Sequence, residues 1–156
     1  ISAFIAWLFN SFKMVIISII PNIIPLLLTA AIMGYFSIAL KPSTILVFSI
    51  AFGISVDDTI HFLAKYRQEL LENKGKIKAS VLSALKETGV SMFYTSVVLF
   101  SGFFIFVASD FGGTIALGLL VSIALMIAML SNLLLLPALL LSLEKVLNYK
   151  ATDARR

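Results

Sequence analysis

Two adjacent carboxylates, Asp57 and Asp58, lie in an apolar stretch, with His61 three and four residues further on. On an α-helix the imidazole shares a face with Asp57 as its i,i+4 neighbour and reaches Asp58 as its i,i+3 neighbour. Inside a membrane, two carboxylates this close are not expected to be charged at the same time. We therefore interpret the pair, together with His61, as a proton site that drives a change of conformation.

Small and polar residues near the acids are candidates for supporting roles. The hydroxyls of Ser55 and Thr59 flank the pair and are candidates for further oxygen ligands, which hard cations prefer. Sodium is therefore an alternative to the proton as coupling ion, although a less favoured one. Gly53, one turn before the acids, is expected to let a neighbouring helix pack closely. Thr95 and Asn132, in later apolar stretches, are candidates for hydrogen bonds toward the acids. No metal site is expected, because adjacent carboxylates on a helix point about 100° apart, and no other cofactor is predicted.

The composition indicates a membrane protein. Of the 156 residues, 60% are hydrophobic and 13% are charged, against about 45–50% and about 25% in soluble domains. So few charged residues, clustered in the sequence, cannot cover a soluble fold of this size. Cysteine is absent from the sequence, which excludes disulfides and thiolate chemistry. Because the sequence contains no catalytic triad, phosphate loop or nucleic-acid-binding pattern, we expect neither an enzyme nor a nucleic-acid partner.

Hydropathy divides the chain into segments of an all-α membrane protein. Residues 1–13 are expected to hold the end of a truncated span and a cytoplasmic turn, residues 14–143 a transmembrane bundle, and residues 144–156 a cytoplasmic tail. The bundle is expected to have four full spans, at about residues 14–34, 43–64, 90–108 and 114–143. Between the second and third spans, residues 65–89 carry an apolar residue every fourth position among lysines, which predicts a cytoplasmic amphipathic helix.

The positions of the basic residues predict the orientation in the membrane. If Lys13 is cytoplasmic, eleven of the twelve basic residues are cytoplasmic and Lys41 alone faces outward, as the positive-inside rule requires. The basic flanks are then expected to contact anionic membrane lipid. Because the sequence starts at Ile1 within an apolar run, we also expect it to be a piece of a longer protein.

Four segments resemble one superfamily of transporters. The acid-bearing segment, residues 53–69, reads GISVDDTIHFLAKYRQE, and residues 16–44, before it, read IISIIPNIIPLLLTAAIMGYFSIALKPST. Residues 87–106 read ETGVSMFYTSVVLFSGFFIF, and residues 131–140 read SNLLLLPALL. Together they resemble the resistance, nodulation and cell division (RND) superfamily, in the branch that contains the MMPL and hopanoid exporters and the Patched-like proteins.

The resemblance implies half of an RND-type membrane domain, the other half and its extracytoplasmic domains belonging to the rest of a parent protein that forms dimers or trimers. It implies an exporter of the bacterial inner membrane, driven by the proton motive force, that moves hydrophobic or amphiphilic molecules or lipids. Asp57 and Asp58 would lie in its proton relay, buried between packed helices. The alternatives are a sterol-sensing type of lipid-binding sensor that does not pump, and a protein-translocation accessory subunit of the same superfamily.

Overall fold

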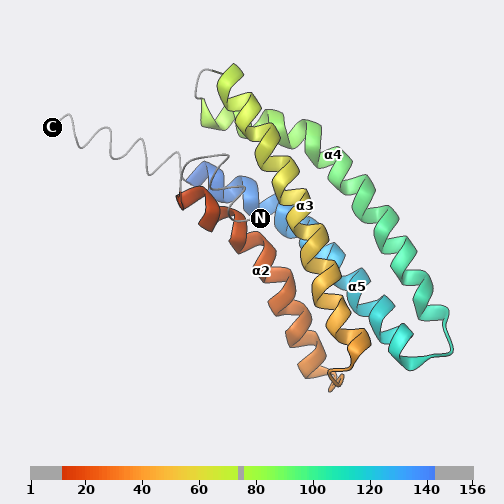
Figure 1. Cartoon of the computed structure of the whole chain (residues 1–156). Coiled ribbons are helices and arrows are strands. Elements are labelled where there is room, and N and C mark those ends of the chain that lie inside the picture. Colours follow the sequence, from red (N-terminus) through yellow and green to blue (C-terminus); the bar gives the residue numbers. More distant parts are fainter. Residues whose placement is uncertain (1–11, 74–75, 143–156) are drawn as a thin grey trace.

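The computed structural model describes residues 12–73 and 76–142. These residues form α2 (Phe12–Tyr35), α3 (Pro42–Glu72), α4 (Ile77–Phe104) and α5 (Gly112–Leu130) (Figure 1). A 3₁₀ turn, η1 (Ile105–Ala108), ends α4. A π-helical turn, η2 (Ser131–Leu135), follows α5, and the helix then resumes over residues 136–142. The prediction of an all-α membrane fold is confirmed; the predicted tail and nearly all of the predicted truncated span lie outside the described residues.

Four helices are long and apolar enough to cross a membrane, namely Ile17–Tyr35, Pro42–Glu72, Ile77–Ala108 and Gly112–Ser142. A helix of 31 residues, such as α3, measures about 46 Å, which exceeds the hydrocarbon core of a bilayer by about 16 Å. The end of α3 and the start of α4 carry the charged residues of the loop region. These two helices are therefore long enough to continue beyond the apolar layer at that end.

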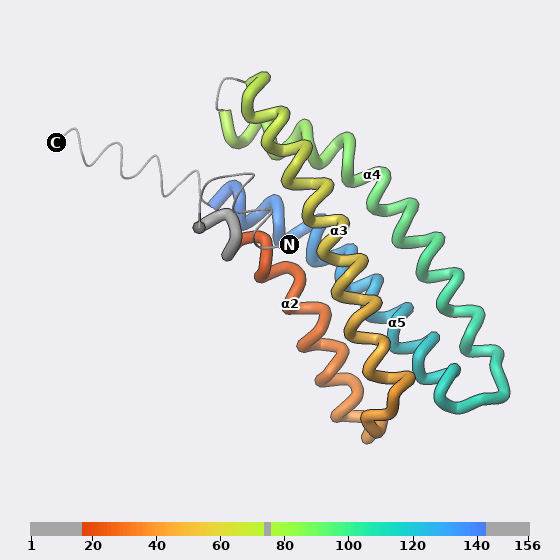
Figure 2. Tube along the Cα trace, viewed as in Figure 1, coloured from red at the N-terminus to blue at the C-terminus, as the bar shows by residue number. Residues whose placement is uncertain are grey.

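Residues 65–89 differ from the predicted separate amphipathic helix. They are divided between the last turns of α3 and the first turns of α4, which lie side by side (Figure 2). Val81 and Ala84 of α4 are fully buried in one apolar cluster with Phe62 and Tyr66 of α3. The apolar repeat in this segment thus packs against α3 rather than lying along the membrane surface. Which side of the membrane it occupies stays a prediction.

The final span, α5 with η2, is the central helix of the bundle. It packs against α2, α3 and α4, and 56% of its apolar stretch is buried, against 11% for the stretch that contains α4. Gly118 permits the closest approach, because a Cβ atom there would lie 2.7 Å from the carbonyl oxygen of Phe103 and 2.7 Å from Cβ of Phe106. The end of α4 therefore crosses α5 at a position that only glycine fits.

Prolines explain the local geometry of the first and last spans. Pro25 has no N–H to donate to the carbonyl of Pro21, one turn earlier in α2. The hydroxyl of Ser131 donates to that buried oxygen instead, at 2.8 Å. The π-helical turn ends two residues before Pro137, and the N–H of Leu136 donates to the carbonyl of Ser131, five residues back. This wider turn directs both of its first two side chains, Ser131 and Asn132, into the core.

Candidate functional site

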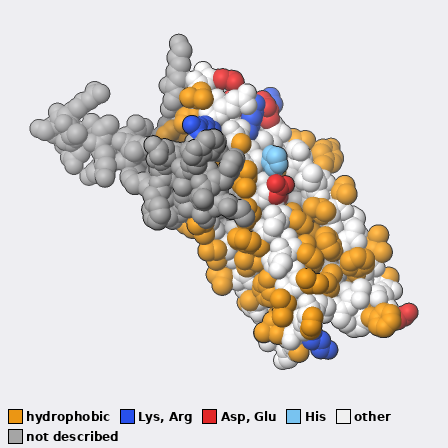
Figure 3. Space-filling model, in the orientation of Figure 1, with side chains coloured by type: hydrophobic (Ala, Val, Ile, Leu, Met, Phe, Trp, Pro, Cys, Tyr) orange, Lys and Arg blue, Asp and Glu red, His pale blue; other side chains and the backbone are white. Residues whose placement is uncertain are grey.

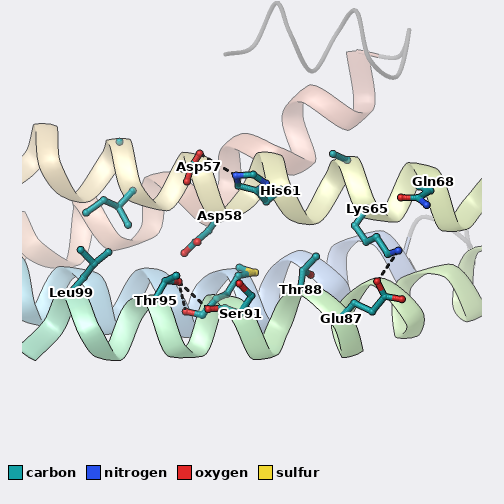
Figure 4. A pocket seen from close by; sticks show the side chains of 14 residues that line it. Asp57, Asp58, His61, Lys65, Gln68, Glu87, Thr88, Ser91, Thr95 and Leu99 are labelled. Atoms are coloured by element: carbon teal, nitrogen blue, oxygen red, sulfur yellow. Dashed lines mark hydrogen bonds and ion pairs between the residues drawn. The ribbon is translucent and has the colours of Figure 1, made fainter.

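The acid pair lines a groove of about 740 Å³ between α3 and α4 (Figure 4). At the charged end of the two helices the groove is bordered by Lys65 and Glu87, and at its other end by Ile54 and Leu99. Polar side chains from both helices lie between these ends: Asp57, Asp58, His61, Thr88, Ser91 and Thr95. The groove therefore has a polar floor that begins at the charged ends of the helices and reaches the acids.

Asp58 is the acid that points into the groove. Its side chain is half-buried and directed at α4, in the direction of Thr95 (Figure 4). The hydroxyl of Thr95 donates to backbone oxygens of its own helix, those of Ser91 and Met92, both at 3.0 Å. Thr95 thus lies across the groove from Asp58, but its hydrogen bonds stay within α4, and the bond toward the acids expected of it stays a prediction. Asp58 is left facing the groove.

Asp57 points away from α4, out of the bundle (Figure 4). Its carboxylate lies 3.6 Å from Nε2 of His61, and both side chains are 72% exposed. The i,i+4 geometry predicted for this pair is therefore present. Within the described chain Asp57 is not buried between helices, and the burial of both acids in the parent protein stays a prediction. The reason for the exposure of Asp57 is the rotation of α3 about its axis, which places the buried Ser55 and Thr59 on the inner face of this turn and leaves Asp57 on the outer face.

The exposed pair lies in a surface that is otherwise uncharged over the middle of the bundle. In Figure 3 the histidine and an acidic side chain lie among apolar and uncharged side chains, while most Lys, Arg, Asp and Glu side chains gather at the ends. Gly53, on the same side of α3, has no atom within 4 Å of the position of a Cβ. The close helix contact predicted at Gly53 is thus not made by any residue that the structure describes.

Ser55, Thr59 and Asn132 face the core and not the acids. The hydroxyl of Ser55 donates to Oδ1 of Asn22 at 2.6 Å, and the hydroxyl of Thr59 lies 3.1 Å from Oδ1 of Asn132. The hydrogen bonds of these side chains join them to one another and to Asn22 across three helices and do not reach the acids. Their supporting role for the acids stays a prediction. Asn22 was not predicted as a site residue, although its position between two prolines in an apolar span is an indication of a special role.

An ion-pair cluster borders the charged end of the groove. Nζ of Lys65 lies 2.7 Å from a carboxylate oxygen of Glu87 on α4 and 3.1 Å from one of Glu69 on α3. Hydrogen bonds to Glu87 and then to Glu69 raise the pKa of Lys65 above its ordinary value of 10.5. A hydrogen bond from Ser83, followed by that from Lys65, lowers the pKa of Glu69 below 4.5. The cluster connects α3 to α4 where both helices leave the apolar span.

Sequence reasoning missed Lys65 and Glu87 as groove residues. Lys65 follows Asp57 and His61 at a constant spacing of four residues, which places all three on one side of a helix. That spacing was a usable indication. Glu87 had no comparable indication, because its place in the groove depends on how α4 packs against α3. Among residues 12–73 and 76–142, no three His, Asp or Glu side chains gather as a metal-binding group.

The sequence model of the MMPL family matches residues 9–154. This chain belongs to the MMPL family. It is also 28% identical over 137 residues to a protein named hopanoid transporter HpnN, from Burkholderia multivorans (strain ATCC 17616 / 249). The match covers 87% of this chain but 16% of that protein. No solved structure is significantly similar to the chain.

Membership of the MMPL family points to an RND-type transporter rather than an enzyme. Together with the four apolar helices, it supports a multi-pass protein of the bacterial inner membrane. The MMPL chain described here spans about one sixth of the length of its curated relative. The activity of a whole protein that contains it is therefore a matter for proposal.

Proposed function

We propose that this chain is part of an RND-type exporter, driven by the proton motive force, that moves hydrophobic or amphiphilic molecules such as lipids. In this proposal Asp58 takes up and releases the transported proton, and Asp57 and His61 form the adjacent part of the relay. The observation that carries the proposal is the place of Asp58, half-buried in the wall of a polar groove within an otherwise apolar span.

The shape of the groove supports access to Asp58 from one side of the membrane. Polar lining residues connect it with Lys65 and Glu87, at the charged ends of the helices, whereas Ile54 and Leu99 border the far end. Water entering at the charged end reaches Asp58 without crossing these apolar side chains. That end is predicted to be cytoplasmic, so in this conformation the proton on Asp58 exchanges with the cytoplasm.

Proton binding at such a site can supply free energy for a change of shape. A charge that moves across the membrane potential gains about 2.3 kcal/mol per 100 mV. A protein whose two conformations bind the proton on opposite sides, with different affinities, converts that gain into a shift between them. The partly buried position of Asp58 between two helices favours this coupling, because neutralising it alters the electrostatic interaction across the α3–α4 groove.

The nature of the substrate rests on the similarity to the hopanoid transporter. Since that protein is named a transporter of hopanoids, a class of lipid, a hydrophobic or weakly amphiphilic lipid is the substrate class that we propose for the parent protein. The proton is the proposed coupling ion. Sodium is less favoured, because the hydroxyls of Ser55 and Thr59, which would complete an oxygen shell around it, turn away from the acids.

We also propose that the rest of the parent protein covers the outward face of Asp57. A charged side chain facing lipid at mid-membrane costs about 2.5–3.5 kcal/mol on insertion scales. Gly53 leaves room beside Asp57 for close contact with another helix, as small residues do in membrane interfaces. A second half of the membrane domain is the expected occupant, and a dimer or trimer of the parent remains the expected assembly.

The experiment is lipid export by the parent protein in proteoliposomes loaded with a hopanoid, under an imposed proton gradient. We expect export to stop when an uncoupler collapses the gradient, and we expect Asp58→Asn and Asp57→Asn to reduce it to background. Asp110→Asn, at an exposed turn, is the matched control and should export normally. A sensor module would bind the lipid regardless of the gradient, and undiminished export by Asp58→Asn would refute the proposal.

A further inference from the structure

Behind the acids, four buried side chains form a closed ring of hydrogen bonds. The hydroxyl of Ser55 donates to Oδ1 of Asn22 at 2.6 Å, and Nδ2 of Asn22 donates to the hydroxyl of Thr59 at 3.0 Å. The hydroxyl of Thr59 in turn lies 3.1 Å from Oδ1 of Asn132, 3.0 Å from the carbonyl oxygen of Ser55 and 3.2 Å from Oδ1 of Asn22, and it donates its single hydrogen to one of these at a time. Nδ2 of Asn132 returns to the hydroxyl of Ser55 at 3.4 Å. When Thr59 donates to Asn132, each member of the ring donates to the next and accepts from the one before.

Neighbouring backbone oxygens fix the direction of this ring. Nδ2 of Asn22 lies 2.6 Å from the carbonyl oxygen of Ser18. Nδ2 of Asn132 lies 2.9 Å from the carbonyl oxygen of Ser55. Turning either amide around would bring two oxygen atoms into repulsive contact. Both amides are thus held in one orientation, and no side-chain polar atom buried in the described residues lacks a partner.

The ring joins three helices at one level of the bundle. Asn22 belongs to α2, Ser55 and Thr59 belong to α3, and Asn132 belongs to η2. It separates two apolar clusters: one is centred on residues such as Phe62, Leu63, Leu136 and Leu140, the other on residues such as Val47, Leu120 and Val121. Apolar packing alone would allow α3 to rotate or slide between these clusters, whereas four directional bonds at one level do not.

The ring also brackets the acid pair. Ser55 and Thr59, one turn apart on α3, lie on either side of Asp57 and Asp58 in the sequence. With about 100° per residue, Asp58 lies about 60° around the helix axis from Ser55 and about 100° from Thr59. When both hydroxyls are held in the core, Asp58 faces α4 and Asp57 faces outward, as the structure has them.

On these grounds we propose that Asn22, Ser55, Thr59 and Asn132 are positioning residues of the proton site, which hold the acid-bearing turn of α3 so that Asp58 faces the groove. The inference rests on the proposed function. The ring itself is uncharged and carries no titrating group, so it acts on proton exchange only through the placement of Asp58. The titrating or charged groups that share the groove with Asp58 are Asp57, His61 and Lys65 of α3 and Glu87 of α4.

The test is a pH titration of the full-length parent protein in lipid nanodiscs, followed by infrared difference spectroscopy. The readout is the C=O band of a protonated carboxyl group that is lost in Asp58→Asn. Thr59→Val keeps the side-chain shape but opens the ring, and we expect it to move the midpoint of this band by about half a pH unit or more, a roughly threefold change in proton affinity. Thr59→Ser keeps the hydroxyl and should retain the wild-type midpoint.

Thr29→Val is the matched control, because Thr29 is equally buried in α2 but bonds only to a carbonyl of its own helix. It should leave the midpoint unchanged. Ser55→Ala opens the ring at another bond and replaces Thr59→Val if that variant does not accumulate. If the ring variants titrate at the wild-type midpoint, the positioning role is overturned. A band that depends on Asp58 would, in that case, still support the proposed proton function. If the wild type has no band that depends on Asp58, the proposed function fails and the positioning role fails with it.

Discussion

At the scale of single residues, the two adjacent aspartates have different environments. Asp58 is half-buried and faces α4, whereas Asp57 is paired with His61 on the outside of the bundle. A hydrogen-bonded ring on the opposite side of α3 holds Ser55 and Thr59 inward, and this rotation separates the acids. These environments are the basis on which the proposed function gives the proton-exchanging role to Asp58 and the adjacent part of the relay to Asp57 and His61.

The ion-pair cluster of Lys65 should not contribute to pH dependence near neutrality. The lowered pKa of Glu69 means that its contribution to stability is present above about pH 4.5 and is lost as pH falls through the folded-state pKa. The raised pKa of Lys65 means that its contribution is present below about pH 10.5 and is lost as pH rises through the folded-state pKa. Between these limits Lys65 and Glu69 keep their charges.

We therefore expect Lys65→Met to lower the melting temperature of the parent protein by the same amount throughout the range from about pH 6 to pH 8. The difference from the wild type should shrink when the pH falls well below about 4.5, where Glu69 becomes protonated. Thermal unfolding of the variant and the wild type, followed by intrinsic fluorescence, measures this difference in melting temperature. Lys86→Met, which removes an exposed lysine of α4, should have little effect, and a difference that changes between pH 6 and pH 8 would contradict this assignment.

At the scale of the helices, hydropathy was sufficient to predict four spans because each apolar run is long and bounded by polar residues. The division of residues 65–89 was not predicted, since Ile77, Val81 and Leu85 have the same spacing whether they face lipid headgroups or α3. The π-helical turn was not predicted either, although Pro137 indicated an interruption. For the site, sequence spacing predicted the contact between Asp57 and His61 but not the rotation of α3, which depends on partners in α2 and η2.

Gly118 provides a test of the packing between α4 and α5. A methyl group in Gly118→Ala would lie 2.7 Å from the backbone oxygen of Phe103, so the helices must separate, at a cost of about 1–3 kcal/mol. This exceeds the gain in helix propensity, which is about 1 kcal/mol or less. Gly102→Ala is the matched control, because nothing lies within 4 Å of that position. Chemical unfolding of the two variants should show destabilisation in Gly118→Ala only; equal stability would rule out the close crossing.

At the scale of the whole molecule, the described chain leaves a charged face within its apolar surface. Such a face is expected to contact protein, whereas apolar faces elsewhere on the bundle are expected to contact lipid. The chain spans 16% of the length of its curated relative, so a parent of that size has ample sequence to cover the face. This arrangement would enclose Asp57 in the assembled transporter, where the separate chain exposes it.

A photo-crosslinking amino acid at Ser49 should therefore attach to another part of the parent protein. Ser49 is exposed on α3 about one turn before Gly53. The comparison position is Phe93, exposed on α4 beside a different, apolar depression, where we expect mainly lipid adducts. Mass spectrometry of the crosslinked products distinguishes protein crosslinks from lipid adducts. Lipid adducts at Ser49 as abundant as those at Phe93 would show that the Asp57 face is open to the membrane.

In the proposed mechanism Asp58 exchanges a proton with water through the groove between α3 and α4. Infrared difference spectroscopy of the full-length parent, between about pH 4 and pH 9, measures this directly and needs no substrate. We predict a protonated-carboxyl band that appears at low pH, shifts in D₂O, disappears in Asp58→Asn and persists in Asp110→Asn. Identical difference spectra for the wild type and Asp58→Asn would contradict the account.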